Sequence, residues 1–269
     1  IKTAKNAVMI GGGYIGLETA ASLTQQGIQV TLLETAPRIL QRVTAPQLSD
    51  FYTRLHQEHG VEICTHLSVE RITGTTHVEG VECCDGRIIA ADLVIVGIGV
   101  QPNIELAAEA GIVVDNGILI DAQCRTNDAN IVAAGDCTQF FQPYYRRQMR
   151  LESVPNANEQ AKVAAATLCE KIKQYDALPW FWSDQYDVKL QIAGLNQGYD
   201  QLIVRGDLQH SHSFAAFYFK RGQLIAADCV NRPLEFMLSK KIIAEKIQID
   251  PNVFADESID LKMLITERV

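Results

Sequence analysis

The chain has 269 residues, of which 47% are hydrophobic and 21% are charged, as in an ordinary soluble globular protein with room for two or three small domains. Its formal net charge of −8 argues against a nucleic-acid partner, because a phosphate backbone attracts a basic surface. The longest apolar stretch, 90–100, is too short to span a bilayer and contains Asp92, so we expect no membrane association.

The first hundred residues alternate between strand and helix patterns. Apolar and β-branched runs are each followed by apolar residues at helical spacing. The predicted elements are a strand at 7–10, a helix at 14–27, a strand at 28–34, a helix at 44–60 with Thr44 as its N-cap, and a strand at 61–64. This βαβαβ order predicts a doubly wound α/β fold.

The next segment predicts shorter elements. Strands at 69–72 and 78–82 lead to an Asp85-Gly86 hairpin turn, and the apolar run 87–100 predicts one buried strand. We then expect a helix from Ile104, strands at 117–120 and 130–134, and an alanine-rich helix from about Asn156. From Leu178 onward, two apolar runs flank Arg221-Gly222 as a hairpin and a helix follows Pro233, which predicts a small α+β domain.

The cysteines and histidines predict neither a disulfide framework nor a metal site. The seven cysteines are odd in number and irregularly spaced, and no Cys-x-x-Cys pair occurs, which favours a cytoplasmic location. The adjacent pair Cys83-Cys84 would form only a strained disulfide. His56 and His59 are three apart on a predicted helix, and we interpret them as a solvated face rather than metal ligands. The chain starts at Ile1 without a secretory leader, which suggests a fragment.

A glycine-rich turn follows the first predicted strand and opens the first helix. Gly11, Gly13 and Gly16 have the G-x-G-x-x-G spacing that allows a tight turn, a close approach of the backbone to a pyrophosphate, and close packing of the helix on the strand. Glu34 ends the next strand, where a carboxylate accepts hydrogen bonds from the ribose hydroxyls of an adenosine. Because that carboxylate repels a 2′-phosphate, the pattern favours NADH over NADPH, although Arg38 and Arg42 are near in sequence.

Glu18 lies on the first turn of the same helix. It is either an exposed carboxylate near a helix N-terminus or a contact for the nicotinamide end of the cofactor, and the sequence leaves both open. Tyr14, Ile15 and Arg42 are further candidate contacts for the nucleotide.

Five motifs together resemble one family. "VMIGGGYIGLE", "ADLVIVGIGVQPN", "IVAAGDC", "ESVPNANEQA" and "PWFWSDQY" occur in the order typical of FAD-dependent NADH:ferredoxin reductases, over essentially the whole chain. The resemblance implies a Rossmann-like NAD-binding domain at 1–100, the C-terminal part of a discontinuous FAD-binding domain at 101–175, and a C-terminal reductase domain at 176–269. The N-terminal part of the FAD domain, with its own glycine-rich loop, is missing.

The resemblance also implies roles for individual residues. Gly97, Ile98 and Gly99 would lie near the NADH, and Asp136 would accept a hydrogen bond from the FAD ribityl chain. Val154 and Pro155 would begin a helix that faces the flavin. Trp182, and with less support Trp180, would lie beside the flavin ring, while core packing is the alternative for both.

The implied activity is electron transfer from NADH through FAD to an iron–sulfur ferredoxin of a monooxygenase or ring-hydroxylating dioxygenase. No side chain need change chemically, and Glu18 and Trp182 are supporting candidates. An acidic ferredoxin would dock on basic residues, and the candidates are Arg146, Arg147, Arg150, Lys162, Lys240 and Lys241. The alternatives are a rubredoxin or another acceptor, and an inactive NADH-binding fragment.

Overall fold

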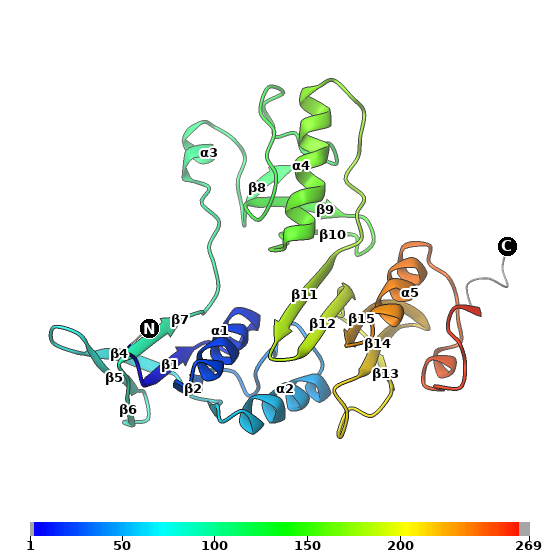
Figure 1. Cartoon of the computed structure of the whole chain (residues 1–269). Helices are drawn as coiled ribbons and strands as arrows, with labels where there is room; N and C mark the ends of the chain where they lie inside the picture. The colour runs from blue at the N-terminus through cyan, green and yellow to red at the C-terminus, as the bar shows by residue number, and fades with distance from the viewer. Residues whose placement is uncertain (1–2, 264–269) are drawn as a thin grey trace. The chain divides into compact units, whose positions relative to one another are not determined.

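A computed structural model of the chain describes residues 3–263, and its helices and strands are drawn in Figure 1. The chain divides into two compact units. The first unit contains residues Ile1–Gly99, Ser183–Leu190 and Val204–Phe214, and the second contains Val100–Trp182, Gln191–Ile203 and Ala215–Val269. Each unit is therefore assembled from separated stretches of sequence.

The first unit is built on a parallel sheet with the strand order β3-β2-β1-β7. Its elements are β1 (Asn6–Ile10), α1 (Tyr14–Gln25), β2 (Gln29–Leu33), α2 (Pro46–Glu58), β3 (Glu62–Cys64) and β7 (Leu93–Val96). β1 pairs with β2 on one side, and α1 connects these two strands. On its other side β1 pairs with β7, which comes from later in the chain, so the strand order reverses between β1 and β7. The prediction of a βαβαβ unit is confirmed, and the carboxyl ends of β1 and β7 form the switch point where such folds bind ligands.

A small antiparallel sheet, β4-β5-β6, interrupts the parallel one between β3 and β7. Its strands are β4 (Val69–Gly74), β5 (Val78–Cys83) and β6 (Ile88–Ala90). The predicted hairpin turn is confirmed, since Gly86 has a φ of 87° and the Cys83 amide donates to the Arg87 carbonyl oxygen over 2.8 Å. Buried side chains of both sheets, among them Val8, Leu33 and Val81, form one hydrophobic cluster.

The prediction of one buried strand over 87–100 was wrong. The run divides into β6 and β7, which lie in different sheets, and Ile88 and Ile98 are each 69% exposed. The division falls at Ala91-Asp92, where the Asp92 carboxylate accepts hydrogen bonds from the backbone amides of Lys5 and Asn6 at 3.0 and 3.1 Å. These hydrogen bonds fix the chain at Asp92, where it leaves one sheet and enters the other. The apolar character of the run does not indicate such a division.

Three smaller predictions for the helices and strands were also wrong. Ala45, not Thr44, is the N-cap of α2, because Pro46 takes the first helical position, where its missing amide hydrogen is not needed. Residues 130–134 form no strand and contribute only an isolated bridge between Arg125 and Val132. His56 does not lie on a solvated face, because its side chain is fully buried.

The second unit contains a three-stranded sheet, β10-β9-β8, and most of a five-stranded sheet, β11-β12-β15-β14-β13. The first group of elements is α3 (Glu105–Glu109), β8 (Ile118–Ile120), β9 (Thr138–Gln142), β10 (Arg147–Met149) and α4 (Val154–Leu168). The second is β11 (Trp180–Gln185), β12 (Val188–Gly194), β13 (Gln201–Arg205), β14 (Phe214–Lys220), β15 (Gln223–Val230), α5 (Pro233–Ala244) and the 3₁₀ helix η1 (Pro251–Phe254). The predicted hairpin of β14 and β15 and the helix after Pro233 are confirmed.

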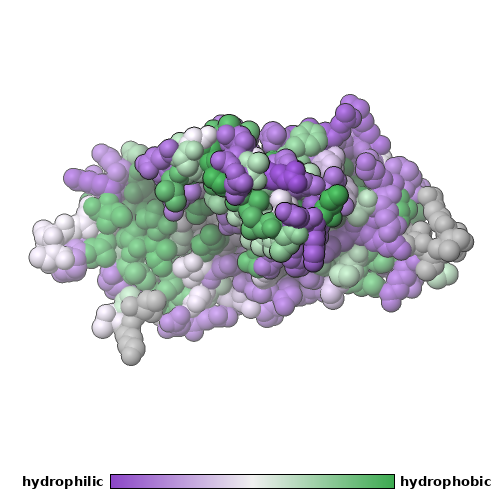
Figure 2. All heavy atoms as spheres, turned by 90° about the horizontal axis from the view of Figure 1, so that it is seen from above, coloured by the Kyte–Doolittle hydropathy of each residue, from purple (hydrophilic) through white to green (hydrophobic). Residues whose placement is uncertain are grey.

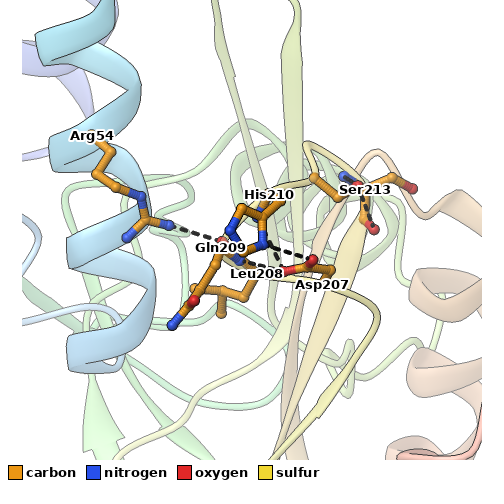
Figure 3. Close-up of polar contacts among 7 residues, drawn as sticks. Arg54, Asp207, Leu208, Gln209, His210 and Ser213 are labelled. Atoms are coloured by element: carbon orange, nitrogen blue, oxygen red, sulfur yellow. Dashed lines mark hydrogen bonds and ion pairs between the residues drawn. The ribbon is translucent and has the colours of Figure 1, made fainter.

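Two segments from late in the sequence complete the first unit by packing on α2. Figure 3 shows Arg54 of α2 beside the loop at 207–213, where its Nη2 donates to the Leu208 carbonyl oxygen over 2.9 Å. Asp207 accepts the backbone amides of Gln209 and His210 at 2.8 and 3.0 Å, which gives the loop a defined turn. Phe51 meets Phe214 edge to face, with ring centroids 4.9 Å apart.

Candidate functional site

The glycine turn between β1 and α1 is packed against the turn that follows β7. Gly11 has a φ of 109°, and a Cβ there would lie 2.4 Å from the Gly97 carbonyl oxygen. A Cβ at Gly16 would lie 2.0 Å from the Gly11 carbonyl oxygen. Both positions therefore require glycine so that the backbone can close on itself.

Gly13 differs from Gly11 and Gly16 because nothing lies within 4 Å of the position that its Cβ would occupy. Gly13 is also the N-cap of α1, and no side chain caps the amides of the first helical turn. Such a helix start attracts anions. The opening fits a dinucleotide pyrophosphate, which needs both a close approach to the backbone and free amide donors.

Glu34 lies beside this turn, directly after β2. Its Oε2 accepts the Gly12 amide over 2.7 Å, and its Oε1 accepts the Ala36 amide over 2.7 Å. The Thr35 hydroxyl donates to Oε1 over 3.2 Å. The carboxylate is thereby fixed next to the glycine turn and presents negative charge where a ribose would lie.

The two nearby arginines differ in their availability. Arg38 is engaged within its own loop, because its guanidinium donates to the Ser49 hydroxyl at 2.5 Å and to the Gln41 and Thr44 carbonyl oxygens at 3.1 and 3.0 Å. Arg42 is exposed. The sequence could not distinguish the two, because the difference depends on the fold of this loop.

The turn after β7 lies open on one side. Gly97 donates its amide to the Ile10 carbonyl oxygen over 2.8 Å, and Gly99 has a φ of 120° with no atom within 4 Å of its Cβ position. Ile15 and Ile98 are exposed, whereas Tyr14 is half-buried. Figure 2 shows hydrophobic residues gathered on the side of the molecule where β5 to β7 lie in Figure 1. An apolar surface next to the glycine turn suits the planar rings of a dinucleotide.

Glu18 is connected to residues that the sequence did not identify as functional. The Ser183 hydroxyl donates to Glu18 Oε1 over 2.5 Å, and Ser183 in turn accepts from Gln185 Nε2 over 3.0 Å. Gln185 Oε1 lies 2.8 Å from His56 Nε2. These residues are far apart in sequence, and only the alternation of Ser183 and Gln185 in their strand indicates a shared face.

In the second unit, Asp136 follows Gly135, whose φ is 92°. The Asp136 side chain is exposed, and its carboxylate makes no hydrogen bond within residues 3–263. Gln160 of α4, which the sequence reasoning missed, is buried and accepts both the Gly135 amide and the Thr138 hydroxyl at 2.7 Å. Gln160 thereby holds the Gly135-Asp136 turn against α4.

The start of α4 and the two tryptophans lie in the same unit. Ser153 is the N-cap of α4 and accepts the Asn156 amide over 3.3 Å, while Val154 is exposed and Pro155 is buried. Trp182 is exposed, and its ring lies 5.6 Å from that of Trp180. Trp180 packs on Phe236 of the core, so its position agrees with the core-packing alternative.

Several of the candidate basic residues are already paired. Arg150 forms a 2.5 Å ion pair with Glu152, and Lys162 forms one with Glu159, also at 2.5 Å. Lys240 lies with its Nζ 4.8 Å from the centre of the Trp180 ring, and burial lowers the pKa of this lysine. Among the candidate cations, Arg146, Arg147, Lys162 and Lys241 are exposed, and of these four Lys162 is the one paired with a carboxylate in the described part of the chain.

Over 3–263 no group of three or more metal-ligating side chains is close enough to hold an ion, and the seven cysteines are free. None of the helices in this range combines the length and the apolar character needed to cross a membrane.

Comparison with known proteins matches both halves of the chain. A family model described as pyridine nucleotide-disulphide oxidoreductase matches residues 1–161, and a reductase C-terminal model matches residues 180–265. The chain is 51% identical to putidaredoxin reductase CamA from Pseudomonas putida over 96% of its own length and 62% of the relative's. It is 42% identical to rhodocoxin reductase from Rhodococcus erythropolis, over 96% of its own length and 60% of the relative's.

Solved structures show similarity to the same kind of reductase. The reductase in the covalent putidaredoxin reductase–putidaredoxin complex superimposes with a TM-score of 0.94 at 49% identity, covering 98% of this chain and 64% of the other. The chain thus spans less than two-thirds of the length of these relatives. The resemblance found from the five motifs is confirmed, and the chain belongs to the pyridine nucleotide-disulphide oxidoreductase family.

Proposed function

We propose that the chain binds NADH and, as part of a flavoprotein, serves to pass electrons from NADH through FAD to an iron–sulfur ferredoxin of a monooxygenase or ring-hydroxylating dioxygenase. The observation that carries the proposal is the open space over Gly13 at the start of α1, with Glu34 fixed beside it. The names of the relatives support the acceptor. One is the ferredoxin–NAD(+) reductase component of an anthranilate 1,2-dioxygenase system in Burkholderia cepacia, at 39% identity.

NADH is favoured over NADPH by the surroundings of the ribose position. The Glu34 carboxylate would accept from the ribose hydroxyls and repel a 2′-phosphate. Arg38 would have to give up its contacts with Ser49 and Thr44 before it could pair with such a phosphate. Of these two arginines, Arg42 is the exposed one, and a single surface cation contributes little affinity by itself.

Residues of the second unit would hold the FAD. The unpaired Asp136 carboxylate would accept from the ribityl hydroxyls, and Val154 and Pro155 would lie near the ring at the start of α4. Trp182 would lie beside the ring, since it is exposed. When bound, FAD accepts a hydride and releases single electrons, which is the chemistry that a ferredoxin requires. The chain's own residues bind and orient the reactants.

A ferredoxin would meet the exposed cations Arg146, Arg147 and Lys241. We also propose a cytoplasmic location, which the seven free thiols support.

Nucleotide binding is tested by comparing the wild type with Gly13→Ala. Gly13 has an ordinary extended backbone and its Cβ would touch no protein atom, so the variant should fold as stably as the wild type. The new methyl group would occupy the space for the pyrophosphate, and NADH affinity measured by calorimetry should fall about tenfold or more. Ser22→Ala, at an exposed position on the same helix, is the matched control. Equal affinities in Gly13→Ala and wild type would refute a dinucleotide on this turn.

The flavin and acceptor steps need a separate experiment. A visible absorption spectrum after incubation with FAD reports whether this chain holds the flavin, and NADH-dependent reduction of a ferredoxin reports the activity. Retained flavin together with ferredoxin reduction supports the whole proposal. A colourless protein that still binds NADH limits the function of this chain to nucleotide binding, and reduction of rubredoxin but not ferredoxin would contradict the proposed acceptor.

A further inference from the structure

A chain of buried polar side chains leads through the first unit to Glu18. Ser183 and Gln185 alternate along β11, so both point to the same face, and each is 1% exposed. His56 on α2 is 0% exposed. Tyr186, at the turn after β11, completes the set, and all of these residues belong to the first unit. We call Tyr186, His56, Gln185 and Ser183 the hydrogen-bond chain.

The contacts of this chain are continuous. The Tyr186 hydroxyl lies 3.2 Å from His56 Nδ1, and His56 Nε2 lies 2.8 Å from Gln185 Oε1. Gln185 Nε2 lies 3.0 Å from the Ser183 oxygen, which lies 2.5 Å from Glu18 Oε1. Residues from two helices and one hairpin are thereby joined into a single path.

The carboxylate at one end sets the direction of every hydrogen bond in the path. A carboxylate only accepts, so Ser183 gives its one proton to Glu18 and accepts from the amide nitrogen of Gln185. The amide oxygen of Gln185 then faces His56, which must carry its proton on Nε2. His56 Nδ1 is left as an acceptor for the Tyr186 hydroxyl. Each donor therefore points one step closer to Glu18.

Two features keep this arrangement in place. Burial, reinforced by the nearby His59, lowers the pKa of His56 to about 4 against the raising effect of the Gln185 hydrogen bond, so the ring stays neutral near pH 7. The Tyr186 ring is held in a left-handed turn with a φ of 57° and stacks on His59, with centroids 3.7 Å apart at 14°. The path is anchored at its far end, and its open end is Glu18.

Stability alone does not explain this choice of residues. Burying polar groups contributes little net stability even when every hydrogen bond is made, and apolar side chains would fill the same space at least as well. The path ends at a half-buried carboxylate whose Oε2 makes no hydrogen bond in the described part of the chain. Glu18 is the fifth residue of α1 and lies beyond its first turn, not on it as the sequence predicts. We expect a dinucleotide with its ribose at Glu34 and its phosphates at the start of α1 to extend towards Glu18.

We infer that the hydrogen-bond chain positions the Glu18 carboxylate to accept a hydrogen bond from the carboxamide at the nicotinamide end of the bound dinucleotide. This inference rests on the proposed function, because it requires NADH on the glycine turn. Ser183, Gln185, His56 and Tyr186 act as positioning residues and do not touch the cofactor. One oxygen of Glu18 is fixed by Ser183, which aims the other at the ligand.

The test compares two ligands on the 269-residue chain. NADH carries the nicotinamide, whereas ADP-ribose has the same adenosine and phosphates without it. Ser183→Ala should weaken NADH roughly 5- to 30-fold, as expected for an interaction of one or two kcal/mol, and change ADP-ribose less than about twofold. Ser183→Thr restores the hydroxyl and should recover most of the loss. The fluorescence of bound NADH, which reports on the nicotinamide ring directly, should change in Ser183→Ala and return in Ser183→Thr.

A double-mutant comparison separates positioning from general stability. In a Glu18→Ala background, Ser183→Ala and Gln185→Leu should have no further effect on NADH affinity, because their target is gone. Equal losses for NADH and ADP-ribose in Ser183→Ala, no loss for NADH, or a wild type that does not prefer NADH over ADP-ribose would each overturn the inference. A wild type that binds neither ligand would instead refute the proposed nucleotide site itself.

Discussion

His56 should make the stability of this chain depend on pH in a way that one substitution removes. The ring is fully buried and its pKa lies at about 4 rather than 6.5, chiefly because burial disfavours its charged form. As the pH falls from 6.5 towards 4, the unfolded chain gains a proton on His56 that the native state does not accept. The free energy of unfolding therefore falls across this window and is independent of His56 below it.

The size of the effect follows from the displacement of the pKa. One pKa unit corresponds to about 1.4 kcal/mol, so the change from 6.5 to about 4 predicts a loss of roughly 3 kcal/mol between these pH values. His56→Gln keeps an N–H donor that can reach Gln185 but has no group that titrates there. The difference in unfolding free energy between wild type and His56→Gln should shift by that amount, in favour of the variant as the pH falls.

Urea unfolding followed by circular dichroism at several pH values measures this difference. Taking the difference between two proteins cancels the titration of the carboxylates that they share. His66→Gln replaces an exposed histidine and serves as the control, and its profile should run parallel to that of the wild type. A wild type and His56→Gln that lose stability in parallel between pH 6.5 and 4 would refute the argument that burial holds His56 neutral.

Three further substitutions test the packing described above, each by urea unfolding. Gly16→Ala places a methyl group 2.0 Å from the Gly11 carbonyl oxygen and should cost about 1–3 kcal/mol, and an unchanged midpoint would contradict the observed closeness of helix and turn. Tyr145→Phe removes a hydroxyl that donates to the Ile225 carbonyl oxygen at 3.0 Å and accepts the Leu195 amide at 2.7 Å, so we expect a loss of about 1–3 kcal/mol; full stability would mean that water replaces the hydroxyl. Lys240→Met removes the cation over Trp180 and should cost about 0.5–1 kcal/mol, whereas a gain would show that burying the ammonium outweighs its contact with the ring.

The parts of the molecule that local sequence controls were predictable. The glycine turn, the first helix and the strand that ends at Glu34 follow from spacing and periodicity over a few tens of residues. The hairpin around Arg221-Gly222 was also predictable, because a two-residue turn restricts the backbone to left-handed angles that these positions adopt.

The parts that depend on distant contacts were not predictable. The run 87–100 resembles one buried strand until Asp92 is known to bind the backbone at Lys5. Ser183 and His56 are separated by more than a hundred residues, and nothing near either one indicates the other. A buried histidine and a solvated one look the same in a sequence, because burial is set by whatever the rest of the chain places on top of the helix.

The first unit is completed by Ser183–Leu190 and Val204–Phe214, which come from the far end of the sequence. A recombinant exchange of nucleotide modules between relatives would therefore fail if it cut once near residue 100. A chimera that took only this module from one protein would contain His56 and Arg54 without the native partners of either. The hairpin tip and the loop that carry those partners would have to be transferred from the same protein. The boundary that matters for modular engineering runs through the strands of the C-terminal sheet and not between consecutive domains.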